Sequence, residues 1–438
     1  MDRQLKTIIT ALKNRTDIDG WLINHGVTES HEFFLIKTKM DMNRTKQVAK
    51  SRVTIYKNFE ADGRKYTGSA AATLPPTLSE TELKTALDDL VLGASFVKNE
   101  RFDLVARQKK DADAVPASVA GKDPMVLASR IIKALYSQNT HQDGRINSVE
   151  LFLEKTERRL LNSRGVDQAY TTYYGEIELI VDWKPSGGES VEIFNVLRFS
   201  DADEEKLKAF AADALETAQL RASAQPMTGV KDVPVILTRT SVPEFLRYFI
   251  LKSSAEMVYQ QYSDIKIGEK LQGETITGDA VTLHLRPIIP GLAGSRSIDS
   301  DGVYLTDHTL YKNGVLQQYH GQNRFSQYLG VPATGIIENA EVEGGASSLA
   351  DLEKSPHLEL LAFSDFQINE ITGDFGGEIR LGRYFDGKDT RVVTGGSISG
   401  NFKESAASMR LSSETHTQDN MICPVAIQLN HVAIANAV

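Results

Sequence analysis

The apolar and polar positions of the first 140 residues follow a helical period in some stretches and a strand period in others. Leu5, Ile8, Ile9 and Leu12 share one helical face. Between the helical stretches, runs rich in β-branched and aromatic residues indicate strands. The predicted elements are a helix at 3–14, strands at 31–40 and 47–59, a helix at 80–94 that begins after 77–79, an exposed connection at 107–123 and a helix at 124–137.

Strand-like patterns dominate from Arg145 to Leu197. Three strands are expected at 146–161, 169–183 and 191–199. A helix should then begin at Ser200 as its N-cap, with acidic residues just behind it, and end before Pro226. We place a domain boundary there, which gives an N-terminal α/β domain at 1–225 and a β-rich C-terminal domain at 226–438.

The second half of the sequence has one long helical pattern among short strand-like runs. A buried strand is expected at 234–239, followed by a helix over 242–262 with Pro243 in its first turn. Asn313-Gly314 lies between two strand-like runs and predicts a hairpin. Further strands are expected at 281–289, 302–320, 357–368, 377–385 and 424–434. The pattern as a whole predicts an α+β protein.

Composition and charge narrow the functional classes. Of the 438 residues, 41% are hydrophobic and 24% charged, which is ordinary for a folded soluble protein. We expect no membrane partner and a cytoplasmic location, because neither a membrane-spanning segment nor a signal peptide is evident. A net charge of −9 disfavours a nucleic-acid partner. The basic run of Arg44, Lys46, Lys50 and Arg52 occupies even positions and indicates one solvated strand face.

The residues that carry chemistry form no recognisable constellation. None of the nine histidines has the i, i+4 spacing of a zinc helix. His308 and His320 flank the expected hairpin and form a possible metal pair that lacks a third ligand. Cys423 is the single cysteine, so no disulfide can form, and we expect its thiol to be buried and inert. Asp374 and Glu378 form a possible carboxylate pair, although each also fits as an ordinary turn or strand residue.

Several blocks, taken in order, resemble the TldD/TldE (PmbA) family. The blocks are NSRGV at 162–166, the run from 302 to 335, ITGDFGGEIRLGRYFDG at 371–387 and TGGSISGNFKE at 394–404. The resemblance covers most of the chain and is most specific at 300–405. It implies a metallopeptidase-related protein whose β-rich C-terminal domain is built on a large curved antiparallel sheet.

The sequence departs from the TldD pattern at the zinc helix. TldD-type subunits carry HExxxH on a helix that precedes an IGE[KR] motif, and here 267–270 read IGEK. The preceding helix contains no histidine, and Glu244 and Glu256 are its only acidic residues. We therefore assign no catalytic residue, no metal ligand and no cofactor to this chain. The resemblance then implies a TldE-like subunit that is catalytically silent alone, with zinc in a TldD-type partner.

The resemblance further implies that the pair cleaves or matures unfolded peptides, which bind as an added β-strand. Three alternatives stay open: a non-enzymatic homodimer that binds peptides, a peptidase that uses His308 and His320, and a regulator that contacts DNA gyrase. The sequence does not distinguish pairing with a TldD-type subunit from pairing with a second copy. The residues expected to contact the peptide are Gly373, Asp374, Phe375, Gly376, Gly377 and Glu378.

Overall fold

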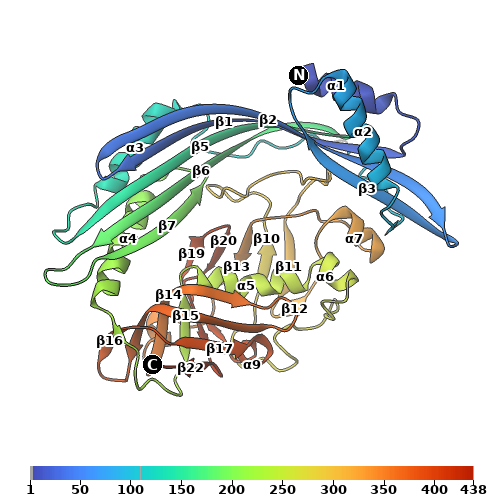
Figure 1. Ribbon diagram of the computed structural model, residues 1–438. Coiled ribbons are helices and arrows are strands. Elements are labelled where there is room, and N and C mark those ends of the chain that lie inside the picture. Colours follow the sequence, from blue (N-terminus) through green and yellow to red (C-terminus); the bar gives the residue numbers. More distant parts are fainter. Residues whose placement is uncertain (1–2, 109, 438) are drawn as a thin grey trace.

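The first half of the chain forms one long curved sheet. In this computed structural model, which describes residues 3–108 and 110–437, seven strands pair in the order β4-β3-β2-β1-β5-β6-β7, all antiparallel. They arch over the second half of the molecule (Figure 1). The strands are β1 (Gly20–Ile36), β2 (Lys39–Ala61), β3 (Arg64–Leu74), β4 (Asn99–Glu100), β5 (Gly144–Asn162), β6 (Asp167–Trp183) and β7 (Val191–Phe199).

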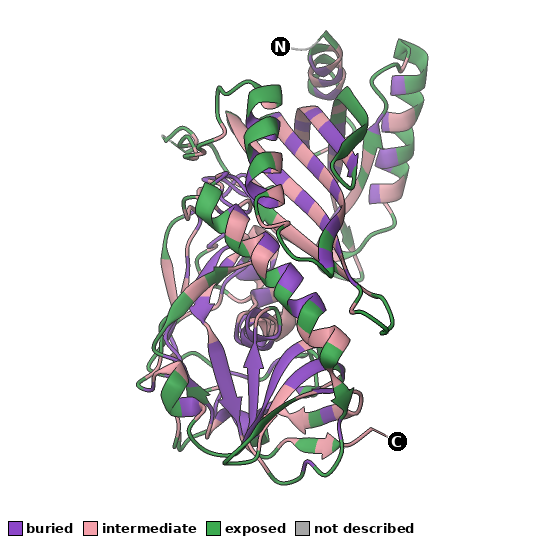
Figure 2. Cartoon of the chain, turned by 90° about the vertical axis from the view of Figure 1, so that its left-hand side faces the viewer, coloured by how far each residue is buried: buried purple, intermediate pink, exposed green. Residues whose placement is uncertain are grey.

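The two faces of this sheet differ because side chains alternate along each strand. On β1, β2, β5, β6 and β7, odd-numbered residues such as Ile23 and Leu151 are buried beneath four helices, whereas on β3 the even-numbered residues lie on this face. Even-numbered residues face the second half of the chain, where Leu22 and Leu160 pack against Ile298. Figure 2 shows the resulting stripes of buried and partly buried residues across the strands. The helices on the odd-numbered face are α1 (Arg3–Lys13), α2 (Glu80–Ala94), α3 (Pro124–Tyr136) and α4 (Glu204–Ser223).

The second half contains two further sheets with α5 (Ser241–Lys252) among their strands (Figure 1). One sheet has the order β12-β11-β10-β13-β20-β19. The other has the order β18-β21-β9-β14-β15-β16-β8, with β17 on β15 and β22 on β17. Both include parallel pairs, namely β13 with β20, β14 with β9 and β16 with β8.

The strands of these sheets are β8 (Gln225–Pro226), β9 (Val235–Thr238), β10 (Leu283–Leu285), β11 (His308–Lys312), β12 (Val315–Leu316), β13 (Ala340–Val342), β14 (His357–Ile368), β15 (Asp374–Phe385), β16 (Thr390–Thr394), β17 (Ser397–Asn401), β18 (Arg410–Leu411), β19 (Thr415–Gln418), β20 (Met421–Pro424), β21 (Ala426–Leu429) and β22 (Ala433–Ala435). The short helices are α6 (Ala255–Tyr259), α7 (Asn323–Tyr328), α8 (Leu349–Leu352) and α9 (Phe402–Ala406).

The α+β fold class and the large curved antiparallel sheet are confirmed, but the long sheet lies in the N-terminal half. From the sequence we expected it in the C-terminal domain, where the strands are in fact shorter and partly parallel. The location was wrong because the alternating pattern of each strand does not reveal that the seven strands from Gly20 to Phe199 pair edge to edge in one sheet. The expected boundary at 225 stays a prediction. Ser297 and Asp113, for example, are joined across it by a hydrogen bond of 3.0 Å between Oγ and the carbonyl oxygen.

Three local predictions were wrong in detail. The strand expected at 31–40 is interrupted by the turn between β1 and β2. Ser200 does not cap α4: its Oγ donates to the carbonyl oxygen of Leu292 at 3.3 Å, and Asp203 caps the helix instead by accepting from the N–H groups of Glu205 and Lys206. The helix expected over 242–262 divides into α5 and α6, where the carbonyl oxygen of His320 accepts a 2.8 Å hydrogen bond from the N–H of Ala255.

Candidate functional site

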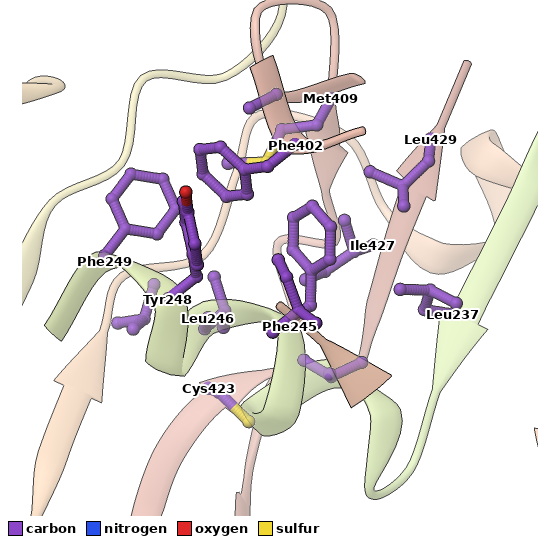
Figure 3. Packing of buried hydrophobic residues seen from close by; sticks show 14 of the residues in the cluster. Leu237, Phe245, Leu246, Tyr248, Phe249, Phe402, Met409, Cys423, Ile427 and Leu429 are labelled. Carbon is purple, nitrogen blue, oxygen red and sulfur yellow. The ribbon is translucent and has the colours of Figure 1, made fainter. Parts of the chain in front are cut away.

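The helix that corresponds to the expected zinc helix is built into the core of the C-terminal half. Most of α5 is buried, and its aromatic residues surround Phe402 of α9 (Figure 3). The ring centroids of Phe245 and Phe249 lie 5.3 Å and 5.2 Å from that of Phe402, and the centroid of Tyr248 lies 4.4 Å from it. This face of α5 therefore has a packing role.

The partly exposed face of α5 carries an ion-pair cluster. The guanidinium of Arg247 lies 3.0 Å from the Glu244 carboxylate and 3.7 Å from that of Asp419, between β19 and β20. We call these three residues the Arg247 cluster. A cation that belongs to the protein already lies between the two carboxylates, and a divalent metal ion there would meet like charge.

Cys423 lies on β20 near this cluster and is completely buried. The pKa of the Cys423 thiol is raised to about 12, chiefly by burial and also by the nearby Asp419 carboxylate, while Arg247 acts in the opposite direction. Zinc binds the thiolate rather than the thiol, so this residue is a poor ligand. A tetrahedral zinc site also needs several nitrogen, sulfur or oxygen ligands. Throughout 3–108 and 110–437, no group of three or more His, Cys, Asp or Glu is placed to hold a metal ion. The residues around α5 do not fit zinc.

His308 and His320 both come near the hairpin that the sequence predicts. That hairpin is confirmed, since Asn313 and Gly314 have positive φ angles of 49° and 80° between β11 and β12. The Nε2 atom of His320 is 2.7 Å from the carbonyl oxygen of Ile250, and that of His308 is 3.1 Å from Thr306 Oγ1. Burial lowers the pKa of both rings. Within the described chain no third metal-binding side chain joins them.

The six residues expected to contact a peptide form the start of β15 and the turn before it. Gly373 has a φ of 78°, and a Cβ there would lie 2.9 Å from the Tyr248 hydroxyl. From Asp374 to Glu378, β15 pairs with β17 on one side, and from Phe375 to Gly377 it also pairs with β14 on the other. Because both edges of β15 are occupied from Phe375 to Gly377, an added strand cannot bind there through the backbone. Their contact with a peptide stays a prediction.

Asp374 and Glu378 have separate partners. The carboxylate of Asp374 accepts hydrogen bonds from Asn401 Nδ2 at 2.8 Å and Thr372 Oγ1 at 2.7 Å. Glu378 accepts one from Ser364 Oγ at 2.8 Å. The hydrogen bonds from Asn401 and Thr372 lower the pKa of Asp374. These contacts favour the turn and strand roles over a shared proton.

The even-numbered face of the curved sheet holds a polar site that the sequence analysis did not identify. A cavity of about 400 Å³ opens across β2, β1, β5 and β6, and Lys50, Arg52 and Arg158 line it. Further along this face, Glu32 of β1 is fully buried and pairs with Arg44 and Lys46 of β2. Burial acts to raise the pKa of Glu32, but hydrogen bonds from the two cations outweigh it, so the pKa lies below its usual value. The even spacing of the basic run in the sequence was the available signal.

The chain is similar to known proteins along its whole length. Residues 230–436 match the family described as the PmbA/TldA metallopeptidase C-terminal domain. No curated protein sequence matches the chain. No helix in the described part of the chain is long and apolar enough to cross a membrane.

Solved structures share the fold. TldE from Thermococcus kodakarensis superposes with a TM-score of 0.75 at 17% identity, covering 98% of this chain and 99% of that one. A Thermotoga maritima protein described as a proposed modulator of a DNA gyrase gives 0.75 at 18% identity, covering 98% of both chains. A Bacteroides thetaiotaomicron protein with a similar description gives 0.75 at 18%, covering 99% of this chain and 98% of that one. Residues 230–436 therefore belong to the family of PmbA/TldA metallopeptidase C-terminal domains, and the chain shares its fold from end to end with these solved structures.

Proposed function

We propose that this chain is a zinc-free, TldE-like subunit that pairs with a TldD-type subunit in the cytoplasm. The partner would hold the zinc and cleave unfolded peptides, either to mature or to degrade them. This chain would contribute a wall of the space in which the peptide is held. The proposal assigns no catalytic step to its residues.

The Arg247 cluster is the observation that carries this proposal. A peptidase that uses zinc needs deprotonated or neutral ligands around an open coordination position. On α5 the exposed groups are instead an arginine and its carboxylate partner, joined at 3.0 Å. The nearby thiol has a pKa of about 12 because it is buried. Both features oppose zinc binding on this side of the helix.

Reconstitution with a TldD-type subunit from the same genome tests the proposal. We expect neither this chain nor zinc-depleted partner to cleave an unfolded fluorogenic peptide, and the mixture to do so only after zinc is added. Titration of this chain alone with zinc should leave no stoichiometric metal after gel filtration.

Three results would contradict the proposal. Chelator-sensitive cleavage by this chain alone would favour a peptidase with other ligands, such as His308 and His320. A stable homodimer that ignores the TldD-type protein would favour the peptide-binding alternative. Recovery of DNA gyrase, without a TldD-type protein, from the native host would favour the regulator.

A further inference from the structure

A cationic groove crosses the even-numbered face of the curved sheet. We use this name for the cavity of about 400 Å³ whose lining includes Gly26, Lys50, Arg52 and Arg158. Lys50 and Arg158 lie on different strands, and β1 runs between them. The register pairs Gly26 with Lys50 on one side and with Arg158 on the other. The three residues therefore form one row across the sheet.

Gly26 leaves the floor of the groove open between the two cations. Adjacent strands are about 4.8 Å apart, so the backbones of Lys50 and Arg158 are separated by roughly 10 Å. The nearest atom to a Cβ built on Gly26 would be Thr156 Cγ2 at 3.5 Å, an ordinary van der Waals distance. A small anionic group fits above this glycine, within reach of a long basic side chain from either side.

The charge of the groove is opposite to that of the whole chain. The net charge of the protein is −9, yet the groove contains several basic side chains and one acidic residue, Glu154. In the described chain Lys50, Arg52 and Arg158 form no ion pair, and Arg158 Nε instead donates to Thr172 Oγ1 at 3.1 Å. Unpaired cations in a partly enclosed site favour a ligand of negative charge.

The second half of the chain closes one end of the groove. Asn24 Nδ2 donates to the carbonyl oxygen of Ser300 at 3.1 Å, and the adjacent Leu160 packs with Ile298. The other end continues along β1 past Thr28, whose hydroxyl is 2.9 Å from that of Thr156. The closed end and the limited volume favour a short flexible segment over a nucleic-acid duplex.

We propose that the cationic groove binds an acidic segment of a peptide, with one carboxylate above Gly26 between Lys50 and Arg158. The inference rests on the proposed role in peptide handling and gives it a substrate preference. The carboxylate comes either from an Asp or Glu side chain or from the C-terminus of the peptide. In both cases charge-assisted hydrogen bonds from the two basic residues hold it.

Fluorescence anisotropy with the full chain alone tests this assignment without any TldD-type partner, so its outcome is independent of subunit pairing. The probe is a fluorescein-labelled ten-residue peptide with four Glu residues, compared with the same peptide carrying Gln. We expect the acidic peptide to bind more tightly by about tenfold or more at low salt, with the difference shrinking as salt rises. The neutral peptide with a C-terminal amide distinguishes the two sources of the carboxylate. If the C-terminus is the recognised group, the amide abolishes the binding of the neutral peptide; if a side chain is recognised, the amide has no such effect.

Matched variants locate the binding. Lys50→Glu and Arg158→Glu should each weaken binding of the acidic peptide about tenfold. Lys65→Glu makes the same charge change at an exposed position of β3, where the side chain is 73% accessible, and should leave binding unchanged. Gly26→Glu should abolish binding by placing a carboxylate in the row, whereas Gly26→Ala should retain most of it.

Equal binding of the acidic peptide and of the neutral peptide that carries a C-terminal amide would overturn the proposal. Equal losses in Lys50→Glu and Lys65→Glu would also overturn it, because they would indicate an effect of net charge alone. Tighter binding of a single-stranded oligonucleotide than of the acidic peptide would refute the assignment to a peptide. Circular dichroism of each variant checks that the fold is retained. If Gly26→Glu does not fold, Gly26→Ala still tests the position between Lys50 and Arg158.

Discussion

The protonation state of Cys423 offers a quantitative test of the account of α5. The thiol is fully buried, and burial raises its pKa to about 12. At pH 8 a thiol with this pKa is about 0.01% thiolate, whereas an ordinary thiol with a pKa of about 8.5 is roughly 20% thiolate. Only the thiolate reacts with alkylating reagents. We therefore expect native Cys423 to react roughly 2,000 times more slowly than a free thiol, before its restricted access is considered.

The same shift opposes metal binding. The rise of the thiol pKa to about 12 from the ordinary value of about 8.5 corresponds to about 5 kcal/mol of additional cost for the thiolate that zinc requires. Iodoacetamide labelling at pH 8, followed by intact mass spectrometry, measures the rate. The urea-unfolded chain should react at the ordinary rate. A Cys423→Ser variant with Ser186→Cys, which moves the thiol to an exposed turn, should react quickly while folded. Native labelling within minutes, or protection of Cys423 by added zinc, would refute the reasoning.

Three further predictions concern the packing and the charges of the fold. Gly68→Ala should destabilise the protein by roughly 1–3 kcal/mol or more, because its Cβ would lie 1.8 Å from the carbonyl oxygen of Ala94; a thermal melt equal to that of wild type would contradict this. Phe402→Ala should cost about 3–5 kcal/mol in urea unfolding, since this fully buried ring contacts three aromatic side chains of α5, and a loss under 1 kcal/mol would disprove that role. Glu32→Gln should lower the free energy of unfolding at pH 7. Burial acts to raise the pKa of Glu32, but hydrogen bonds from neighbouring cations outweigh it and lower the pKa, so the ionised carboxylate stabilises the fold. The stability that comes from this lowered pKa is fully present above the unfolded value of 4.5 and is lost as the pH falls through the folded value. The difference in unfolding free energy between variant and wild type should therefore shrink in acid. A difference that is constant from pH 7 to pH 3 would rule this out.

Local signals in the sequence predicted many elements of the fold. Ser79 and Glu82 form the capping box that begins α2, and Asn313-Gly314 forms the predicted hairpin. The cap of α4 was misplaced because Ser200 and Asp203 are both good N-cap residues, and the Ser200 side chain instead contacts Leu292. Such a contact joins residues far apart in the sequence and leaves no local pattern.

The candidate sites depend still more on long-range pairing. The basic residues of β2 appeared as a solvated face because the sequence does not show that Arg158, more than 100 residues away, joins Lys50 through Gly26. The absence of zinc-binding histidines on α5 was evident from the sequence. The Arg247 cluster was not, since Asp419 reaches it from the turn after β19.

Native mass spectrometry of the chain purified from its own host tests whether this chain is the zinc-free member of a pair. We expect a complex with a second subunit of similar mass and about one zinc per pair, while this chain released from the complex carries none. Release of this chain with zinc bound, or its purification as a zinc-loaded homo-oligomer, would show that the zinc site lies in this chain.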